Sequence, residues 1–510
     1  MAIIKNQQDN PLYKWMVAVS VMSGAFMVVM DTTVVNVALP KIMAAFGANI
    51  DKIQWVVTAY MLSMAIMMPS VGWLSSRIGN KALFVSSLTI FTLASALCGT
   101  AWNEDALIIF RILQGVGAGS LMPIAMAIIF EAFPPEQRGL AMGVYGLGAT
   151  FGPAVGPTLG GYLTEKFSWH LIFYLNVPVG FLGVFLAMAI LPQGRTRKGL
   201  RFDFWGFLTM AIGLGCLLMA LSQGQREGWT SSFILFFFFA SMLAFAAFFF
   251  VEFHTPQPFI DLKVYRSFTY SMATAVFVIQ GLGLFGATFL IPLFFENMLQ
   301  YTALQTGFLM LPMALAVSVV LPLTGRLADL MDARILIAMG IFFSIVSLYW
   351  LSLLDLRTST TSAVGMLIMR GLGIGFIFPA LMNTALKNLP PDKVATGSGL
   401  MNVSRQVGGA FGVAILGAML DRRQVFHLSL FSQAQNLNSL STSMFIQRLQ
   451  ESFMGLGSGA DAAYQKALAF LHLFVKKEAM VAAYDDCFLI AAGFFLFAFI
   501  PTLLLRTRKH

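Results

Sequence analysis

Long apolar runs alternate with short polar segments along almost the whole chain. A helix needs about 20 mostly apolar residues to cross a bilayer, and by that criterion the pattern predicts fourteen membrane spans. They are residues 15–39, 53–73, 82–101, 106–130, 138–161, 170–191, 204–222, 232–252, 271–296, 306–325, 335–354, 362–385, 398–420 and 487–505. The first run lacks a small-residue cleavage pattern, so we interpret it as a span rather than a signal peptide. The short connections favour an all-α bundle of antiparallel neighbours.

The composition agrees with a multi-pass membrane protein. Hydrophobic residues make up 58% of the chain and charged residues 11%, which is too little polar surface to cover a soluble globule. With the N-terminus inside, eighteen Lys and Arg residues fall in cytoplasmic segments and five in outer loops. This bias predicts both termini in the cytoplasm, at the inner membrane of the cell. Topology thus accounts for the net charge of +9, and no nucleic-acid partner is expected.

Two parts of the chain repeat each other at a nearly constant offset. Gly143 recurs as Gly399, 256 residues later, and the same offset relates several further Gly and Pro positions. Residues 72–81 match residues 325–334 at an offset of 253. We therefore expect two six-helix halves in the same orientation, residues 1–191 and 271–510, separated by a linker, residues 192–270, with two extra helices.

One predicted helix is unusually rich in glycine and proline. In lipid, small residues four positions apart allow a neighbouring backbone to approach closely, and Pro is tolerated. The sequence therefore predicts a closely packed, bendable helix in each half, which permits the halves to rock. Its small or kinking positions are Gly143, Gly152, Gly156, Pro157, Gly160 and Gly161, with Gly408 and Gly412 in the second copy.

Charges at membrane depth are costly and mark candidate functional sites. Asp31 lies about 12 Å, and Arg111 about 8 Å, from the outer end of its span at helical rise. If the two spans are neighbours, the pair neutralises itself, and the arginine holds the carboxylate ionised until a change of access or a bound cation alters the balance. The alternative is a fixed structural ion pair. Gln114 and Asn36 are expected to extend this polar site.

Two other polar residues are candidates for a substrate cavity. Arg405 precedes a Gly pair and either contacts a substrate or bonds to helix ends. Glu296, near the outer end of its span, either offers a carboxylate to a cationic ligand or is a solvated loop residue. The many Phe and Met residues suit a pliable apolar cavity.

The repeated cytoplasmic loops are candidates for gating. In the first copy, glycines permit a tight turn, and two basic side chains are placed to hold the carbonyl ends of adjacent helices. In the second copy, an acid and a base are placed to form a latch between a charge and a helix end. The residues concerned are Gly72, Arg77, Gly79, Lys81, Asp329 and Arg334.

Residues 421–485 form a long outer segment between the last two spans. From residue 445 to residue 483 apolar residues recur at helical spacing, with an interruption at residues 455–459. This pattern predicts one or two amphipathic helices on the outer membrane surface or against a partner. The alternative is a loop that packs on its own bundle.

The sequence shows no pattern typical of an enzyme's active site. The five His and three Cys residues show no metal-ligand spacing and no nucleophile partner, so neither a metal nor a cofactor is expected. The glycines of residues 115–119 lie inside an apolar span with no preceding strand, which argues against a dinucleotide loop.

Several motifs together resemble the major facilitator superfamily, specifically its fourteen-span drug:proton antiporters of the EmrB/QacA type. The resemblance covers nearly the whole chain. It rests on Asp31-Thr-Thr-Val-Val-Asn36-Val-Ala-Leu-Pro40, Leu107-x3-Arg111-x2-Gln114-Gly115, the glycine helix of residues 143–161, Trp169-His-Leu-Ile-Phe-Tyr-Leu-Asn176-Val-Pro178 and Asp203-Phe-Trp-Gly206. One departure is Ser76, where the superfamily usually has Asp, so a carboxylate latch is not expected in the first copy.

The resemblance implies export of amphipathic or hydrophobic drugs by alternating access, driven by the proton gradient. The outer segment looks most like that of EmrB-type members, which implies a periplasmic adaptor and an outer-membrane channel as partners besides membrane lipid. Two alternatives remain: an exporter of one endogenous metabolite, such as a siderophore, sugar or fatty acid, and a lipid-scrambling or sensor protein that uses no proton gradient.

Overall fold

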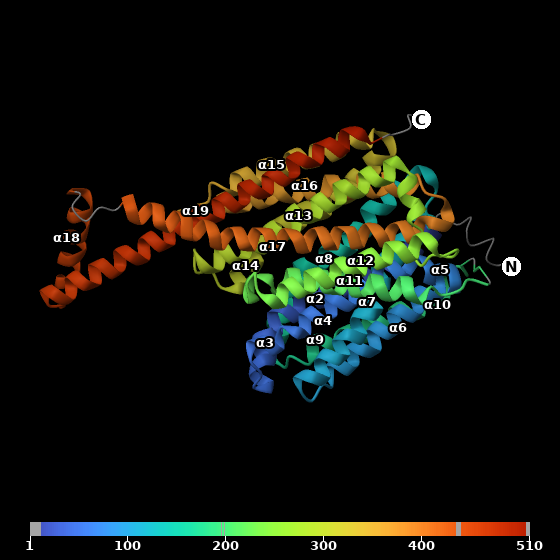
Figure 1. Ribbon diagram of the computed structural model, residues 1–510, viewed down its shortest axis with the longest axis horizontal. Helices are drawn as coiled ribbons and strands as arrows, with labels where there is room; N and C mark the ends of the chain where they lie inside the picture. Colours follow the sequence, from blue (N-terminus) through green and yellow to red (C-terminus); the bar gives the residue numbers. More distant parts are fainter. Residues whose placement is uncertain (1–11, 195, 198, 435–439, 506–510) are drawn as a thin grey trace.

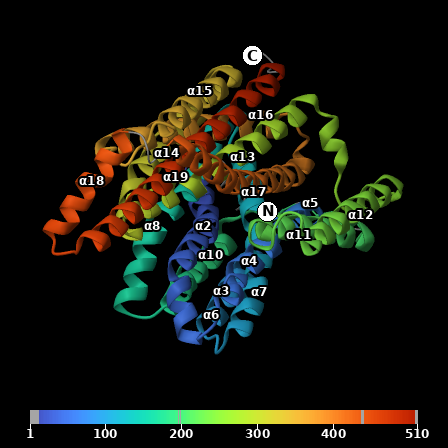
Figure 2. The same ribbon diagram turned by 60° about the vertical axis from the view of Figure 1, so that its left-hand side comes forward.

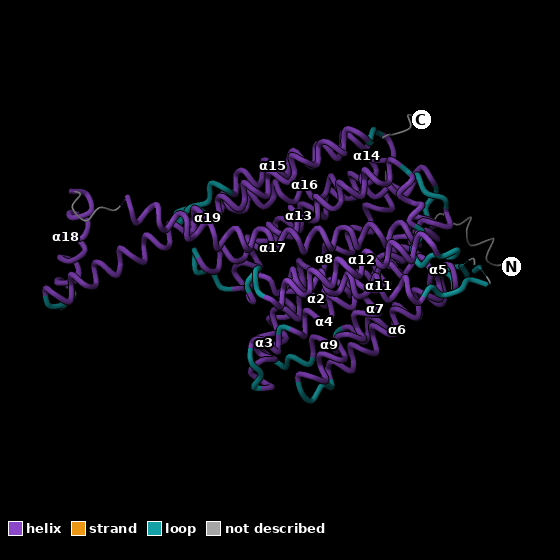
Figure 3. The backbone as a smooth tube through the Cα atoms, in the orientation of Figure 1, coloured by secondary structure: helices purple, strands orange, loops and turns teal. Residues whose placement is uncertain are grey.

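The computed structural model describes residues 12–194, 196–197, 199–434 and 440–505. Every regular element in these ranges is a helix (Figure 1, Figure 3). Thirteen helical segments of the described chain are long and apolar enough to cross a membrane. A further helix of 29 residues, α8 (Arg138–Lys166), occupies the position predicted for the fifth span. The expected all-α, fourteen-span fold is therefore confirmed.

The helix starts follow the predicted spans within a few residues except in the last helix, whereas several helices run past their predicted ends, the first by seven residues. The first six spans are α2 (Tyr13–Phe46), α4 (Trp55–Met67) with η1 (Met68–Ser70) and α5 (Val71–Ile78), α6 (Asn80–Gly99), α7 (Glu104–Ala132), α8, and α9 (Leu171–Tyr174) with α10 (Asn176–Ile190). The two linker helices are α11 (Phe204–Glu227) and α12 (Ser232–His254). The last six are α13 (Phe268–Asn297), α14 (Ala303–Leu330), α15 (Ala333–Leu351), α16 (Thr360–Lys387), α17 (Val394–Ala434) and α19 (Ala460–Leu504). The short helices are α3 (Ile50–Ile53), η2 (Pro135–Gln137), η3 (Leu262–Arg266), η4 (Pro391–Lys393) and α18 (Leu440–Gly455).

Polar caps define many of the helix starts. The side chains of Asn103, Asp203, Ser267 and Ser359 each accept a hydrogen bond from a backbone N–H in the first turn of the helix that follows. Thr302 forms a reciprocal capping box with Gln305 at the start of α14. Such caps satisfy backbone donors that the helix itself leaves unpaired. At these positions the helix starts are therefore fixed by local side-chain hydrogen bonds.

We call the end of the bundle where α2 begins and α19 ends the base, and the opposite end the top (Figure 1). At the base the first six spans contact the last six through glycine-lined crossings. A methyl group built at Gly399 of α17 would lie 2.8 Å from the carbonyl oxygen of Met68. Gly143 of α8 is pressed in the same way against the carbonyl oxygen of Leu321 in α14. The base of the bundle is thus tightly closed.

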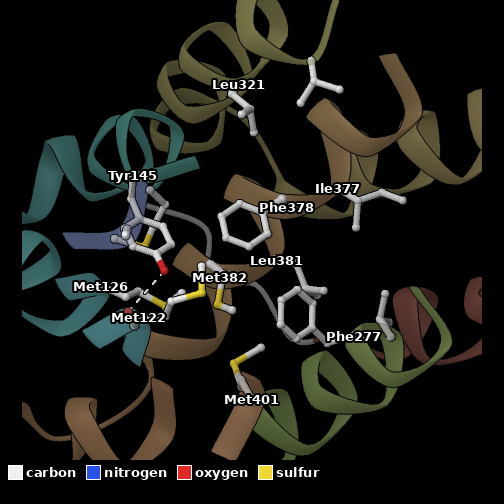
Figure 4. Close-up of a cluster of buried hydrophobic side chains, with 14 of the residues drawn as sticks. Met122, Met126, Tyr145, Phe277, Leu321, Ile377, Phe378, Leu381, Met382 and Met401 are labelled. Atoms are coloured by element: carbon white, nitrogen blue, oxygen red, sulfur yellow. Dashed lines mark hydrogen bonds between the residues drawn. The ribbon is translucent and has the colours of Figure 1, made fainter. Parts of the chain in front are cut away.

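A cluster of aromatic and sulfur-containing side chains fills the space between the two groups of helices. Tyr145 of α8 stacks on Phe378 of α16, with ring centroids 6.2 Å apart. Figure 4 shows Met122 and Met126 of α7 beside Met382 of α16 and Met401 of α17. Flexible thioethers fill irregular gaps without fixing one geometry, which suits an interface between parts that move.

The outer segment of residues 421–485 differs from its prediction. It contains helices with a break at residues 456–459, as expected, but two of them are extensions of spans: α17 is 41 residues long and α19 is 45. They project beyond the top of the bundle and carry α18 (Figure 1). Ile446 of α18 is buried with Leu471 and Val475 of α19. We call residues 421–434, α18 and residues 460–485 the stalk. It packs largely on itself because each helix buries one apolar stripe against the others.

Candidate functional site

Asp31 lies on α2 in the interior of the bundle and is 1% exposed. One carboxylate oxygen is 2.5 Å from Nη1 of Arg111, on α7. The other accepts hydrogen bonds from the side-chain amides of Gln114 and Asn176, each at 2.9 Å. Both oxygens therefore have partners, and the predicted pairing of Asp31 with Arg111 and Gln114 is observed.

Two nitrogens of the Arg111 guanidinium form hydrogen bonds within the protein. Its Nε donates to the carbonyl oxygen of Val56 at 3.0 Å, and Nη1 also donates to Oε1 of Gln114 at 2.7 Å. The guanidinium carbon lies 3.9 Å from the ring centroid of Tyr60, a cation–π distance. Nη2 is buried and has no hydrogen-bond partner among the described residues. The charge is thus compensated by a single carboxylate within an otherwise neutral shell.

The helix geometry explains how these side chains meet. Arg111 and Gln114 are three residues apart and share one face of α7. Asn176 begins α10, and its amide also donates to Ser95 of α6 at 3.1 Å. Five helices, α2, α4, α6, α7 and α10, therefore contribute to one buried network. Such a network can hold one proton and couple its arrival to helix packing.

Asn36 does not belong to this site. It is exposed and lies five residues after Asp31, about 140° further round α2 at 100° per residue. The expected contribution of Asn36 is therefore not seen in this structure. Asn176, Ser95 and Tyr60 were not singled out for the site from the sequence. For Asn176 a signal existed, namely an amide inside an apolar span.

The other cavity candidates lie apart from this network. Glu296 is half-buried on the last turn of α13, and Arg405 is half-buried on α17. The guanidinium carbon of Arg405 lies 5.2 Å from the ring centroid of Phe277 and 5.7 Å from that of Phe378. Arg405 therefore sits against the aromatic cluster between the two groups of helices.

The glycine helices pack closely, as predicted. A methyl group at Gly152 would lie 2.8 Å from a backbone nitrogen of α2, and Gly156 and Gly160 also face α2. In the second copy Gly408 and Gly412 are pressed against carbonyl oxygens of α13. Gly161 differs because a methyl group there would meet nothing within 4 Å. The side chain of Pro157 lies outside the described part of the structure.

Asp329 forms the contact expected of a latch. Its carboxylate accepts hydrogen bonds from the backbone N–H groups of Gly139 at 2.6 Å and Leu140 at 3.0 Å, in the first turn of α8. A carboxylate at a helix N-terminus accepts hydrogen bonds from backbone N–H groups that the helix leaves unpaired, and its negative charge interacts favourably with the helix dipole. In the first copy the Ser76 hydroxyl donates to the carbonyl oxygen of Gly72 in its own helix, and the Ser76 carbonyl oxygen accepts from the backbone N–H of Arg197. Ser76 therefore offers no charge to a helix N-terminus as Asp329 does. Arg334 is the second residue of α15, where its backbone N–H donates to the Asp332 side chain at 2.9 Å, and its Nε has no hydrogen-bond partner among the described residues.

The basic residues of the first loop contact backbone carbonyl oxygens. Lys81 donates to the carbonyl oxygen of Met188, near the end of α10, at 2.6 Å. Arg77 donates to that of Leu200 in the linker at 3.4 Å. Gly79 has φ = 85°, a left-handed conformation that favours glycine. Gly72 is in close contact with Thr396 of α17, across the base.

The fold and the buried polar network together define a multi-pass α-helical membrane protein of the transporter class. Residues 21–204 and 201–413 match the family model of the Major Facilitator Superfamily, and the chain belongs to this family. Membership in a family of transporters supports a transport role rather than an enzymatic one.

The chain resembles several proteins over almost its full length. It is 30% identical over 489 residues to the "Uncharacterized MFS-type transporter YhcA" of Bacillus subtilis, covering 95% of this chain and 91% of the relative. It is 28% identical to the "Multidrug export protein EmrB" of Escherichia coli, covering 96% and 95%. The crystal structure of the human organic anion transporter MFSD10 has a TM-score of 0.64 at 12% identity, over 97% of this chain and all of that one, which shows the shared fold.

Proposed function

We propose that this protein is a proton-coupled antiporter that exports amphipathic or hydrophobic toxic compounds by alternating access. The observation that carries the proposal is the buried pair of Asp31 and Arg111, which is 0% exposed at both side chains. An ionisable pair at membrane depth is expensive and is retained where it serves transport. The relatives named as multidrug export proteins support the substrate class.

The proposed cycle uses the carboxylate as the proton carrier. A proton from the outer side neutralises Asp31, which weakens its contacts with Arg111, Gln114 and Asn176. The network then relaxes, α2 and α7 shift, and the base opens while the top closes. Release of the proton to the cytoplasm restores the ion pair and returns the protein to the closed-base state described above.

We further propose that residues 1–191 and 271–510 are the two rocking halves and that residues 192–270 form the linker. In this arrangement the base, where α2 begins and α19 ends, faces the cytoplasm. The basic residues of the base support this orientation in an inner membrane. The closed base then corresponds to an outward-facing state.

The stalk is proposed to bind a periplasmic adaptor that leads to an outer-membrane channel. It extends the protein along the export direction, and it exposes large apolar residues, including Val425 at 68% and Leu473 at 64%. Exposed apolar side chains beyond the membrane are suited to a protein partner.

The test is transport by everted vesicles that carry Asp31→Asn. Native protein is expected to accumulate a lipophilic dye when a proton gradient is present and to stop when an uncoupler is added. Asp31→Asn is expected to lose at least about 90% of this gradient-driven uptake, because its amide cannot carry a proton across the cycle. Asn36→Ala, on the exposed side of the same helix, is the matched control and should retain transport.

Gradient-driven uptake by Asp31→Asn at the native rate would disprove the coupling role. If the uncoupler leaves dye uptake by native protein unchanged, the result would favour a scramblase or sensor. A growth comparison with toxic cations, anions, siderophores, sugars and fatty acids then separates a multidrug exporter from an exporter of one metabolite.

A further inference from the structure

A groove of about 1050 Å³ lies between the linker helices and the second group of spans, and it takes no part in the proposed proton cycle. Its walls come from α11, α12, α13, α17 and the loop of residues 255–266. Figure 2 shows α11 and α12 side by side at the edge of the bundle. The groove therefore opens on the surface that faces lipid.

The groove is apolar along its length and basic at one end. Leu214, Phe245, Phe249 and Val407 line its deeper part. The distance from Phe253 to Phe245 along α12 is about 12 Å at helical rise, close to the roughly 15 Å depth of one leaflet's hydrocarbon. The groove thus runs from the base surface toward the middle of the membrane.

The basic end carries two exposed cations, Lys263 and Arg266. The nearby acid Asp261 is already paired with Lys393 at 2.8 Å, so it does not cancel them. Among the described residues, neither cation has a carboxylate oxygen within 4.0 Å of its charged nitrogens. Burial raises the pKa of the Tyr265 phenol, so this third polar side chain at the mouth stays neutral. The mouth is therefore net positive.

A buried acid fixes the loop that presents these cations. Glu252, on the last turns of α12, is 5% exposed and accepts a hydrogen bond from the backbone N–H of Ile260. This bond folds residues 255–262 back under α12. Phe259 and Ile260 are buried as a result. Glu252 is thus a positioning residue, and the basic mouth is a built feature of the fold.

From this geometry we infer that the groove binds an anionic phospholipid of the inner leaflet, with its phosphate at Lys263 and Arg266 and an acyl chain against α12 and α17. Basic pockets between helices on the cytoplasmic side have the charge and depth that such a lipid requires. The linker helix α11 contacts α4 of the first six spans and α17 of the last six. The bound lipid therefore lies where the linker helices meet the two groups of spans.

The experiment is native mass spectrometry of the full-length purified protein titrated with phosphatidylglycerol or phosphatidylcholine. Native protein is expected to bind one phosphatidylglycerol at least about tenfold more tightly than phosphatidylcholine. The double variant Lys263→Gln/Arg266→Gln should lose this preference. The matched control Arg197→Gln/Arg326→Gln removes two exposed charges elsewhere at the base and should keep it.

Val407→Trp provides a second variant, which narrows the deep part of the groove and leaves both cations in place. It is expected to weaken phosphatidylglycerol binding, since the acyl chain loses its space. Equal binding of the two lipids to native protein, or unchanged preference in the double variant, would overturn the inference. If inorganic phosphate displaces phosphatidylglycerol equally well from native protein and from Val407→Trp, the site binds a soluble anion. That result would also overturn the inference. None of these readouts depends on proton coupling.

Discussion

Gly399 of α17 packs against the carbonyl oxygen of Met68, so closely that an added methyl group would lie 2.8 Å away. Gly143 and Leu321 make the equivalent contact, since Gly143 precedes Gly399 by 256 residues and Leu321 follows Met68 by 253. The internal repeat of the sequence thus reappears as two related contacts that close the base. Because the glycines have no side chain, the helix backbones approach each other directly.

A side chain at Gly143 is expected to open the base. In Gly143→Val the new atoms would clash with α14, at a cost of about 1–3 kcal/mol. The measurement is thiol labelling of Thr396→Cys in a background without Cys98, Cys216 and Cys487, which should become faster. Gly161→Ala is the control, since a methyl group there meets nothing within 4 Å. Equal labelling in both variants would contradict the idea.

Loss of the Asp329 carboxylate should weaken the same closure. Asp329→Asn removes a charged acceptor from the N-terminus of α8, with an expected loss of about 1–2 kcal/mol. Spin labels at Glu136→Cys and Met331→Cys should report a larger population of long distances across the base. Asp392→Asn breaks only the exposed pair with Arg197 and should leave the distances unchanged. An unaltered distribution in Asp329→Asn would argue against the latch.

Replacing one partner of the buried ion pair should lower the free energy of unfolding more than replacing both partners. Arg111→Gln leaves Asp31 as an uncompensated buried charge, which is expected to lower the free energy of unfolding by about 3–5 kcal/mol. The double variant Asp31→Asn/Arg111→Gln should regain much of this stability but not transport. Thermal unfolding of the purified protein measures the difference, and Glu104→Gln, at an acid that is 21% exposed and paired with Lys52, is the control. A double variant as unstable as Arg111→Gln would indicate that charge burial is not the cause.

The stalk is expected to unfold separately from the bundle. In Leu471→Asp a charge would replace a side chain that is 8% exposed in the stalk core. Limited proteolysis within residues 440–475 should accelerate, whereas the thermal midpoint of the bundle should change little. His472→Asp, one position along the same helix, introduces the same charge on another face of α19 and serves as the control. A matching drop in bundle stability would show that stalk and bundle fold as one unit.

The membrane topology and part of the site could be predicted without coordinates. Asp31 and Arg111 stand out because a charge in an apolar span is costly, and their similar depth suggested a pair. Asn36 was also expected to extend the site, yet helical rotation places it about 140° away from Asp31, and its side chain is exposed. Asn176 lies 145 residues from Asp31 and enters the site only because α10 packs beside α2.

The sequence by itself determined the number of spans, the repeat and the glycine positions where helices cross, because lipid imposes span length and close packing requires small residues. Only the tertiary structure decided which polar side chains share a site, that the base is closed, and that residues 421–485 form a stalk continuous with two spans. These features depend on contacts between residues far apart in the chain. A linear pattern carries the periodicity of each helix but not its neighbours.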